Sequence, residues 1–291
     1  MFVENFLNYI ISQGKSKNTI EAYTRDIQEF KDYFKEYNLT DITKITRFHL
    51  DNYFKFLAEK IVGGKLLCNS TRARKVSTIK SFFKYLAEIK IISEDISEKI
   101  KPPRKTDKDP VYLTVKESVE LINGVKSVII KTMIVFLLNT GLRISELINI
   151  NLKDIQKDFA MTIKGKGNKE RRVLLNPMCR EQLIKYITER KKRVNQEELA
   201  LFISNKGSRM SIMNAQIRIK KEIEKILNRN DVSVHKLRHS FATMQLKAGV
   251  DLITLQKQLG HSKVSTTAMY AFVDTEQTDE AFRKNPLFSS R

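Results

Sequence analysis

Cysteine is scarce in this chain. Cys68 and Cys179 are its two cysteines, and they lie far apart in the sequence with no CxxC spacing. The sequence therefore indicates no disulfide framework. The two thiols suit a reducing compartment, where we expect them to be structural or incidental.

Long hydrophobic runs are also absent. The most apolar run spans residues 127–138, is interrupted by Lys131, and falls far short of the roughly 20 residues that cross a bilayer. The opening stretch "MFVENFLNYIISQGK" has neither a basic n-region nor a small-residue cleavage site, so it is not a signal peptide. We expect a cytoplasmic protein of a bacterial or archaeal cell, without a membrane partner.

Acidic residues are few relative to basic ones. The chain has 33 Asp and Glu against 53 Lys and Arg, which gives a formal charge of +20. Such a surplus indicates a polyanionic partner, and nucleic acid is favoured over an anionic membrane because no spanning segment exists. The 291 residues, 41% of them apolar, are enough for two domains with separate cores.

Residues 1–98 show helical periodicity. Their apolar side chains recur at spacings of three and four, which predicts four amphipathic helices in a small bundle, with Gly63 and Gly64 as a break. Asn18 with Glu21 predicts an N-terminal cap. The apolar stripes are Phe2, Phe6 and Ile10; Ile20, Tyr23, Ile27, Phe30 and Phe34; Leu50, Tyr53, Phe54 and Leu57; and Ala73, Val76, Ile79, Phe82, Phe83 and Leu86.

Four basic residues of the last predicted helix lie mainly off its apolar stripe. They are Arg72, Arg74, Lys75 and Lys80. Such residues can form a solvated face with no partner. At this net charge we favour the alternative, a surface that contacts DNA.

Residues 99–110 interrupt the helical pattern. Three prolines, mixed charge and almost no apolar residues predict a linker between a domain of residues 1–98 and one of residues 111–291. Thr114 with Glu117 predicts a capping box. The stretch "AMTIKGKGNKERRVLL" predicts a hairpin, so the fold is expected to be mainly α with a small antiparallel sheet. Helices are expected at about 115–123, 127–139, 143–150, 178–194, 211–227, 234–248, 251–259 and 265–273.

Two histidines and an arginine are concentrated in the stretch "VHKLRHSFATMQLKAGV". A helix would bring His235, Arg238 and His239 to one face, because they stand at i, i+3 and i+4. A zinc protease would need HExxH, but Lys236 occupies the glutamate position and repels a cation. We therefore expect no metal here, and a phosphate is the better candidate ligand.

Further groups suited to phosphate chemistry recur along the second domain. Arg143 opens a predicted helix in "NTGLRISEL", with Glu146 three residues later. Lys166 lies at the tip of the hairpin, in a turn that is not a Walker loop. His261 follows a helix-ending glycine in "LGHSKVSTTAMY", with Tyr270 nine residues further on. An arginine pair can neutralise a phosphoryl transition state without a metal, and a tyrosine can be a covalent nucleophile.

Taken together, these motifs resemble the tyrosine recombinase (phage integrase) family, most closely the Xer type in length. The resemblance is carried by "TGLRISEL", "GKGNKER", "HKLRHSFATMQLKAG" and "QLGHSKVSTTAMY" in this order, and by "SKNTIEAYTRDIQEF" and "STRARKVSTIKSFFKYL" in the N-terminal region. It implies a SAM-like helical core-binding domain and a mostly α catalytic domain that form a C-shaped DNA clamp. One departure is Phe272, where the family often has histidine.

The resemblance also implies a role for each motif residue, and no cofactor. Tyr270 would attack a DNA phosphate to give a 3′-phosphotyrosine and a free 5′-hydroxyl. The other implied roles are a phosphate clamp for Arg143 and Arg238, proton donation to the leaving oxygen for Lys166, proton acceptance for His235, a phosphate hydrogen bond for His261, and support for Glu146. We expect His239 to face inward, as a packing or support residue. Lys169 competes for the role of Lys166, and we expect Lys169 and Arg171 to contact DNA.

The implied partners are a double-stranded recombination site and further copies of the chain. A homotetramer on two DNA sites would exchange strands through a Holliday junction, either alone or with a related second recombinase or an accessory protein. In the cell, the DNA-bound protein would lie with the nucleoid. A tail helix at 274–283 could fold back on its own domain, and the resemblance favours that it docks on the neighbouring protomer instead. The alternatives are a relaxing topoisomerase with the same chemistry, and a non-catalytic DNA-binding regulator on the same fold.

Overall fold

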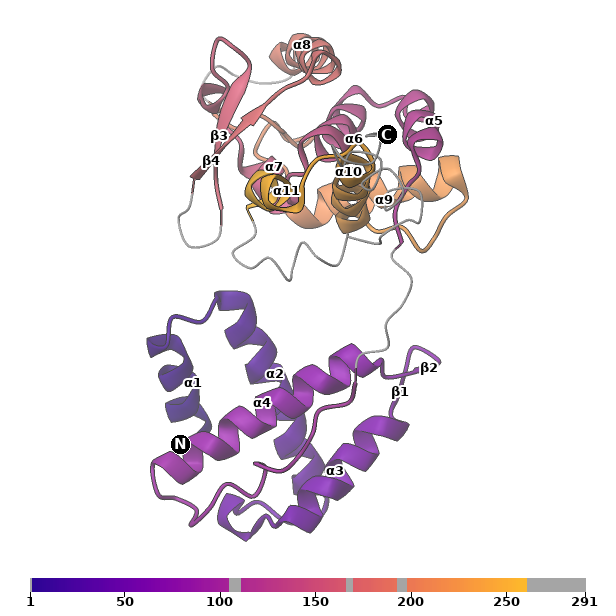
Figure 1. The fold of residues 1–291 in the computed structure, drawn as a ribbon. Helices are drawn as coiled ribbons and strands as arrows, with labels where there is room; N and C mark the ends of the chain where they lie inside the picture. Colours follow the sequence, from indigo (N-terminus) through magenta and orange to yellow (C-terminus); the bar gives the residue numbers. More distant parts are fainter. Residues whose placement is uncertain (1, 105–110, 166–169, 193–197, 261–291) are drawn as a thin grey trace, which may run out of the picture. The chain divides into compact units, whose positions relative to one another are not determined.

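The computed structural model describes residues 2–104, 111–165, 170–192 and 198–260 (Figure 1). The chain divides into two compact units, Met1–Lys108 and Asp109–Arg291. Both units are mainly helical, and the described residues include two small antiparallel sheets of two strands each. The fold class predicted from the sequence is confirmed.

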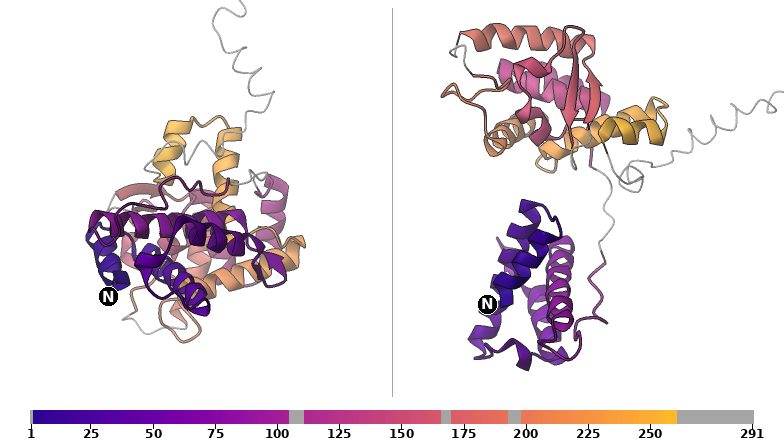
Figure 2. Two further views of the ribbon diagram at one scale, coloured as in Figure 1. Left: turned by 90° about the horizontal axis from the view of Figure 1, so that it is seen from below. Right: turned by 90° about the vertical axis from the view of Figure 1, so that its left-hand side faces the viewer.

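The first unit is a bundle of four helices, which the views of Figure 2 show from two further sides. The predicted apolar stripes turn inward, and the core that they form is unusually rich in aromatic rings. Phe30 lies in its middle, with its ring perpendicular to that of Tyr53 at a centroid distance of 5.0 Å. The helices are α1 (Phe2–Ser12), α2 (Lys17–Glu36), α3 (Arg47–Glu59) and α4 (Asn69–Glu88), with a short 3-10 turn at Ile42–Lys44.

Two local features of this unit differ from the sequence prediction. Helix α2 is capped by Ser16, whose hydroxyl accepts a hydrogen bond from the Thr19 N–H, and Asn18 already lies within the first turn. Strands β1 (Ile61–Val62) and β2 (Lys65–Leu66) pair around the two glycines that were predicted only as a break. The positive φ angles of these glycines, 59° and 77°, suit a tight two-residue turn.

The second unit contains seven described helices and a hairpin. The first helix begins with the predicted capping box, in which the Thr114 hydroxyl accepts from the Glu117 N–H and the Glu117 carboxylate accepts from the Thr114 N–H. The helices are α5 (Val115–Gly124), α6 (Val128–Thr140), α7 (Ile144–Asn149), α8 (Pro177–Lys191), α9 (Ile212–Leu227), α10 (Val234–Lys247) and α11 (Leu252–Leu259), with a 3-10 turn at Leu152–Asp154. They agree with the predicted ranges, while the helix predicted at 265–273 lies outside the described residues.

The predicted hairpin is formed by strands β3 (Ala160–Lys164) and β4 (Glu170–Leu174). The strands are antiparallel, with Ala160 opposite Leu174 and Lys164 opposite Glu170. This register places Arg171 opposite Ile163, one step from the end of the hairpin that leads into residues 166–169.

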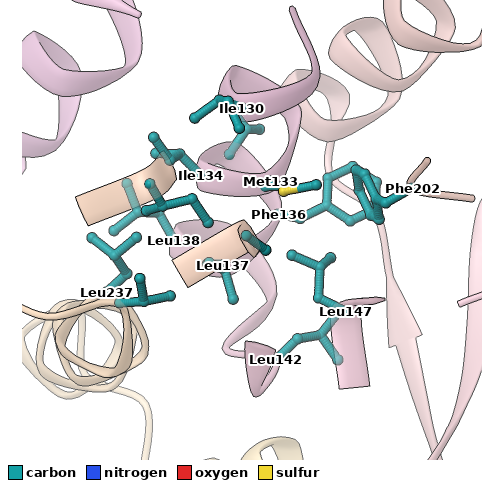
Figure 3. Packing of buried hydrophobic residues seen from close by; sticks show 14 of the residues in the cluster. Ile130, Met133, Ile134, Phe136, Leu137, Leu138, Leu142, Leu147, Phe202 and Leu237 are labelled. Atoms are coloured by element: carbon teal, nitrogen blue, oxygen red, sulfur yellow. The ribbon is translucent and has the colours of Figure 1, made fainter. Parts of the chain in front are cut away.

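Helix α6 is the centre of the second core. It is apolar on nearly every side, and α5, α8, α9 and α10 pack around it. Figure 3 shows part of this core, in which side chains of α6 such as Leu137 lie among Leu147, Phe202 and Leu237. The most apolar run of the sequence is therefore a buried core helix, and none of the helices in the described ranges is long and apolar enough to cross a membrane.

The C-terminal end of α6 packs closely against α10. Gly141 caps α6 in the left-handed conformation, at φ +62°. A Cβ atom on Gly141 would lie 2.4 Å from the ring of Phe241. Only glycine meets both conditions, so this residue fixes how closely the segment that starts at Arg143 approaches α10.

Candidate active site

Glu146 is the centre of a cluster of three arginines. The carboxylate accepts from Arg143 Nη1 at 2.7 Å and from the Arg143 backbone N–H at 2.9 Å. It also accepts from Arg171 Nη1 at 3.1 Å and Arg171 Nη2 at 2.7 Å, and Arg238 Nη1 lies 3.7 Å from Oε2. Burial alone would raise the pKa of Glu146, but the hydrogen bonds from Arg171 and Arg143 and their charges lower it to about 2.

Arg143 is the arginine of this cluster that reaches solvent. It is the cap residue of α7, and its extended backbone turns the chain from α6 into that helix. Its side chain is 32% exposed, whereas that of Glu146 is 7% exposed. The predicted pairing of Arg143 with a supporting carboxylate three residues later is thus present, and the guanidinium remains accessible to an anion.

Arg238 lies beneath the surface rather than on it. The residue is 1% exposed, and its guanidinium donates from Nη1 to the carbonyl of Gly141 and from Nη2 to that of Leu259, both at 2.6 Å. The guanidinium thus binds the carbonyl ends of α6 and α11, and the phosphate contact predicted for Arg238 stays a prediction. Its charge nevertheless lies in the same cluster as Arg143.

The two histidines of α10 differ in their surroundings. His235 is exposed to solvent, and His239 is buried with its ring centroid 4.9 Å from that of His235. The pKa of His235 is lowered by partial loss of water around the ring and then by the charges of Arg238, Lys236 and Arg143. His235 is therefore mainly neutral near pH 7 and can accept a proton, and the inward position expected for His239 is present.

Arg171 was expected to contact DNA, and in the structure it is largely buried. Its side chain is 9% exposed and forms a two-pronged pair with Glu146. The sequence gives little warning of this contact, because the partner carboxylate is 25 residues away.

The basic residues of α4 divide into two groups. Lys75 is buried, and its ammonium lies 3.1 Å from Asp26 Oδ1 and 2.8 Å from Glu29 Oε2. The charge of Lys75 thus joins α4 to α2, and the predicted DNA contact of this residue stays a prediction. Lys80 is half-buried and donates to the carbonyls of residues 98 and 100, both at 2.7 Å.

Arg72 and Arg74 retain exposed surface on the same helix. Arg72 donates to Asn69 at 3.2 Å and is half-buried. Arg74 is 41% exposed and pairs with Asp26, a residue that is itself 1% exposed. Sequence reasoning missed Asp26, and the one available signal was a carboxylate next to Ile27 in an otherwise apolar stripe.

Several predicted residues lie outside the described ranges. They are Lys166, Lys169, His261 and Tyr270, together with the predicted tail helix. Among the described residues, no group of three or more His, Cys, Asp and Glu side chains could hold a metal ion. Among the described residues, Arg143 and Arg238 are suited to bind a phosphate, and His235 is suited to accept a proton beside it.

Comparisons with known families cover both units. The pattern of the phage integrase family matches residues 112–277, and that of the phage integrase N-terminal SAM-like domain matches residues 3–90. The chain is 36% identical to the tyrosine recombinase XerC of Caldanaerobacter subterraneus subsp. tengcongensis, over 98% of this chain and 86% of that protein. It is 34% identical to the tyrosine recombinase XerD of Staphylococcus epidermidis, over 94% of this chain and 95% of that protein.

Solved structures share the fold. The Tn1549 transposon integrase in complex with circular intermediate DNA is 20% identical, with a TM-score of 0.77 over 97% of this chain and 98% of that one. The XerH recombinase bound to its difH substrate is 23% identical, with a TM-score of 0.70 over 90% of this chain and 78% of that one. Both similarities concern the fold alone, since the sequence identities are low.

Proposed function

This chain belongs to the phage integrase family of tyrosine recombinases, and we propose which of its residues carry out each step of the strand exchange. The chain is a site-specific recombinase of the Xer-like type. The observation that carries the assignment of residues is that three separate segments, "TGLRISEL", "HKLRH" and the end of α11, meet at Glu146 and Arg238.

The cleavage step exchanges one phosphoester bond for another. The Tyr270 oxygen forms a bond to the DNA phosphorus, and the bond from phosphorus to the 5′-oxygen breaks. His235 takes the tyrosine proton and Lys166 gives a proton to the leaving 5′-oxygen, so that atoms and charge balance. Rejoining is the reverse reaction, with a 5′-hydroxyl as the attacking group, and the conserved bond energy removes the need for ATP.

The arginines supply the electrostatic part of this step. A tyrosine hydroxyl has a pKa of about 10, so at neutral pH it attacks only if a base and a positive site assist it. Arg143 reaches solvent and can bind two phosphate oxygens, while Arg238 adds its charge from the floor of the cluster. His261 completes the set of phosphate donors in this proposal, and Glu146 with His239 supports it.

Trapping the covalent intermediate tests this assignment. A duplex with a nick close to the cleavage position loses the short 5′-hydroxyl strand after attack, so the protein–DNA ester accumulates. The wild-type chain should form this adduct with excess EDTA present. Tyr270→Phe should bind the same duplex with unchanged affinity and form no adduct. An adduct in the Tyr270→Phe variant, or a need for magnesium, would contradict the mechanism.

The assembly on DNA is the second part of the proposal. We propose that residues 1–98 and 111–291, joined by the linker 99–110, hold opposite faces of a recombination site as a clamp. Four protomers on two sites would then exchange strands through a Holliday junction, with or without a second recombinase. A two-site recombination assay with the purified chain alone separates these cases, since product without any added protein shows that one recombinase is enough. Relaxation of supercoiled DNA that carries a single site would instead favour the topoisomerase alternative.

A further inference from the structure

Arg171 connects segments that are far apart in the sequence. From β4 it reaches Glu146 on α7 with two hydrogen bonds, at 3.1 and 2.7 Å. The same side chain also lies against Gly260, where an added Cβ would lie 3.1 Å from Arg171 Nη1 and 3.4 Å from its Cδ. Gly260 ends α11 in the left-handed conformation, at φ +64°. The Arg171 side chain thus binds the Glu146 carboxylate and packs against the last turn of α11.

We propose that Arg171 is a positioning residue of the cleavage site, which orients Arg143 through Glu146 and fixes the end of α11 through Gly260. The inference rests on the proposed function for its catalytic consequence. Its structural part, that Arg171 holds the end of α11, stands on the contacts alone.

The geometry argues against a direct phosphate contact for Arg171. Its side chain is 9% exposed, and both of its terminal nitrogens donate to Glu146. Arg143, in contrast, donates one side-chain hydrogen bond to the same carboxylate, from Nη1, and is 32% exposed. Glu146 therefore connects the two arginines. Arg171, which is buried, fixes the position of the carboxylate, and the carboxylate in turn orients Arg143, which is accessible.

The position of α11 matters because its end lies at the cluster. Arg238 binds the carbonyl of Leu259 at 2.6 Å, and Arg171 covers the next residue, Gly260. The last described turn is thus held by two arginines that both lie near Glu146. Phosphoryl transfer depends on placing charges accurately, and a displacement of about 1 Å can lower the rate on the order of a hundredfold.

The main experiment compares neighbouring arginines on the same strand. Arg171→Met and the control Arg172→Met remove one charge each, and Arg172 is 64% exposed and paired with Asp158. Single-turnover adduct formation at saturating protein should fall about a hundredfold for Arg171→Met, and stay within about twofold of wild type for Arg172→Met. DNA affinity should fall equally in both variants. Arg171→Lys should not restore the rate, because an ammonium cannot form the two-pronged pair.

A double variant tests whether Arg171 acts through Glu146. If it does, Arg171→Met combined with Glu146→Gln should cleave no more slowly than the slower single variant, since both remove the same contact. Additive losses, together with a salt dependence of DNA binding that falls by about one charge only in Arg171→Met, would identify Arg171 as a phosphate contact and overturn the proposal.

A readout without DNA keeps the inference separate from the proposed function. The Gly260 N–H is bonded to the carbonyl of Lys257 at 3.1 Å in the last turn of α11. Hydrogen exchange in this turn of the full chain should become faster in Arg171→Met and in Arg171→Lys, and remain unchanged in Arg172→Met. Unchanged exchange in both Arg171 variants would overturn the structural part, whether or not the wild-type chain cleaves DNA. If the wild-type chain forms no adduct, the proposed function is refuted. The hydrogen-exchange result alone then decides whether Arg171 holds the end of α11.

Discussion

At the scale of single residues, the ionisation of Glu146 is linked to the stability of the second unit. Its pKa is lowered from 4.5 to about 2 in the folded chain. Its stabilising contribution is therefore complete above pH 4.5 and is lost as the pH falls toward 2. A pKa difference of this size corresponds to about 3 kcal/mol. Urea unfolding should show this loss between pH 7 and pH 3, and Glu146→Gln should be less stable at pH 7 with a weaker pH dependence.

A control for this prediction lies on α8. Glu181 is fully exposed and pairs with Lys185 at 2.6 Å. Glu181→Gln should leave the unfolding free energy nearly unchanged, because an exposed pair within one helix contributes little. An equal effect from both variants would show that the buried cluster has no special role.

The protonation of His235 is a second prediction at this scale. Partial loss of water around the ring and the charges of Arg238, Lys236 and Arg143 lower the pKa of His235 below 6.5. The ring should therefore be neutral at pH 7 and titrate only at more acidic pH, and its own effect on stability should be unfavourable once the pH falls below 6.5. NMR titration of the imidazole signals, assigned with His235→Gln, measures the midpoint. A midpoint above 6.5 would contradict the structure.

The sequence identifies residues at this scale better than it identifies their surroundings. The motifs single out Arg143, Arg238 and Glu146, which the structure brings together. The periodicity of α4 and β4 alone could not show that Lys75 and Arg171 are buried, because each is neutralised by a carboxylate from a remote segment. Burial of a charge depends on a partner that only the folded chain supplies.

At the scale of elements, the end of α6 sets the distance to α10. Gly141→Ala would place a Cβ 2.4 Å from the ring of Phe241, in addition to straining a residue at φ +62°. Gly249→Ala is the matched control, since its φ is +85° and no atom lies within 4 Å of an added Cβ. Backbone strain alone costs about 1–2 kcal/mol in either variant, and the clash with Phe241 adds to it only in Gly141→Ala. Gly141→Ala should therefore lower the free energy of unfolding more than Gly249→Ala does. Equal losses would mean that the ring of Phe241 moves aside freely.

Helices were easier to predict than other elements. Regular spacing of apolar residues and local caps such as Thr114 with Glu117 are encoded within a few residues, and the helices of both units appear where that spacing predicts them. The β1–β2 hairpin was missed because its strands are two residues long and exposed, so they carry no alternating pattern. The cap of α2 was misplaced by two residues because Ser16 and Asn18 are both good capping residues, and only the backbone geometry separates them.

At the scale of the whole molecule, the charge of +20 predicts how the chain binds DNA. Affinity should fall steeply with salt, because each neutralised phosphate releases counterions. Residues 1–98 and 111–291 prepared separately should each bind weakly, and the linked chain far more tightly through effective concentration. Binding measured by anisotropy from 50 to 200 mM salt tests both statements. Full affinity from either piece alone would contradict the proposed clamp.

Not all of that charge is available to DNA. Lys75 and Arg171 are buried against carboxylates, and Lys80 binds backbone carbonyls of its own unit. The number of phosphates contacted by the described residues is therefore smaller than the composition suggests. Which side chains reach a groove and read bases is a property of the complex, and composition carries no information about it.

The carboxylate of Glu146 also has a consequence for selectivity. With three arginines around one fixed anion, the cluster has a charge of +2 rather than +3. A small solute anion, such as inorganic phosphate, gains only this reduced attraction from the three arginines and Glu146. A duplex brings its phosphate on a long chain of further charges, so many weak contacts add to the same one. We therefore expect the internal anion to weaken the binding of free phosphates at this site more than that of DNA, which has further contacts.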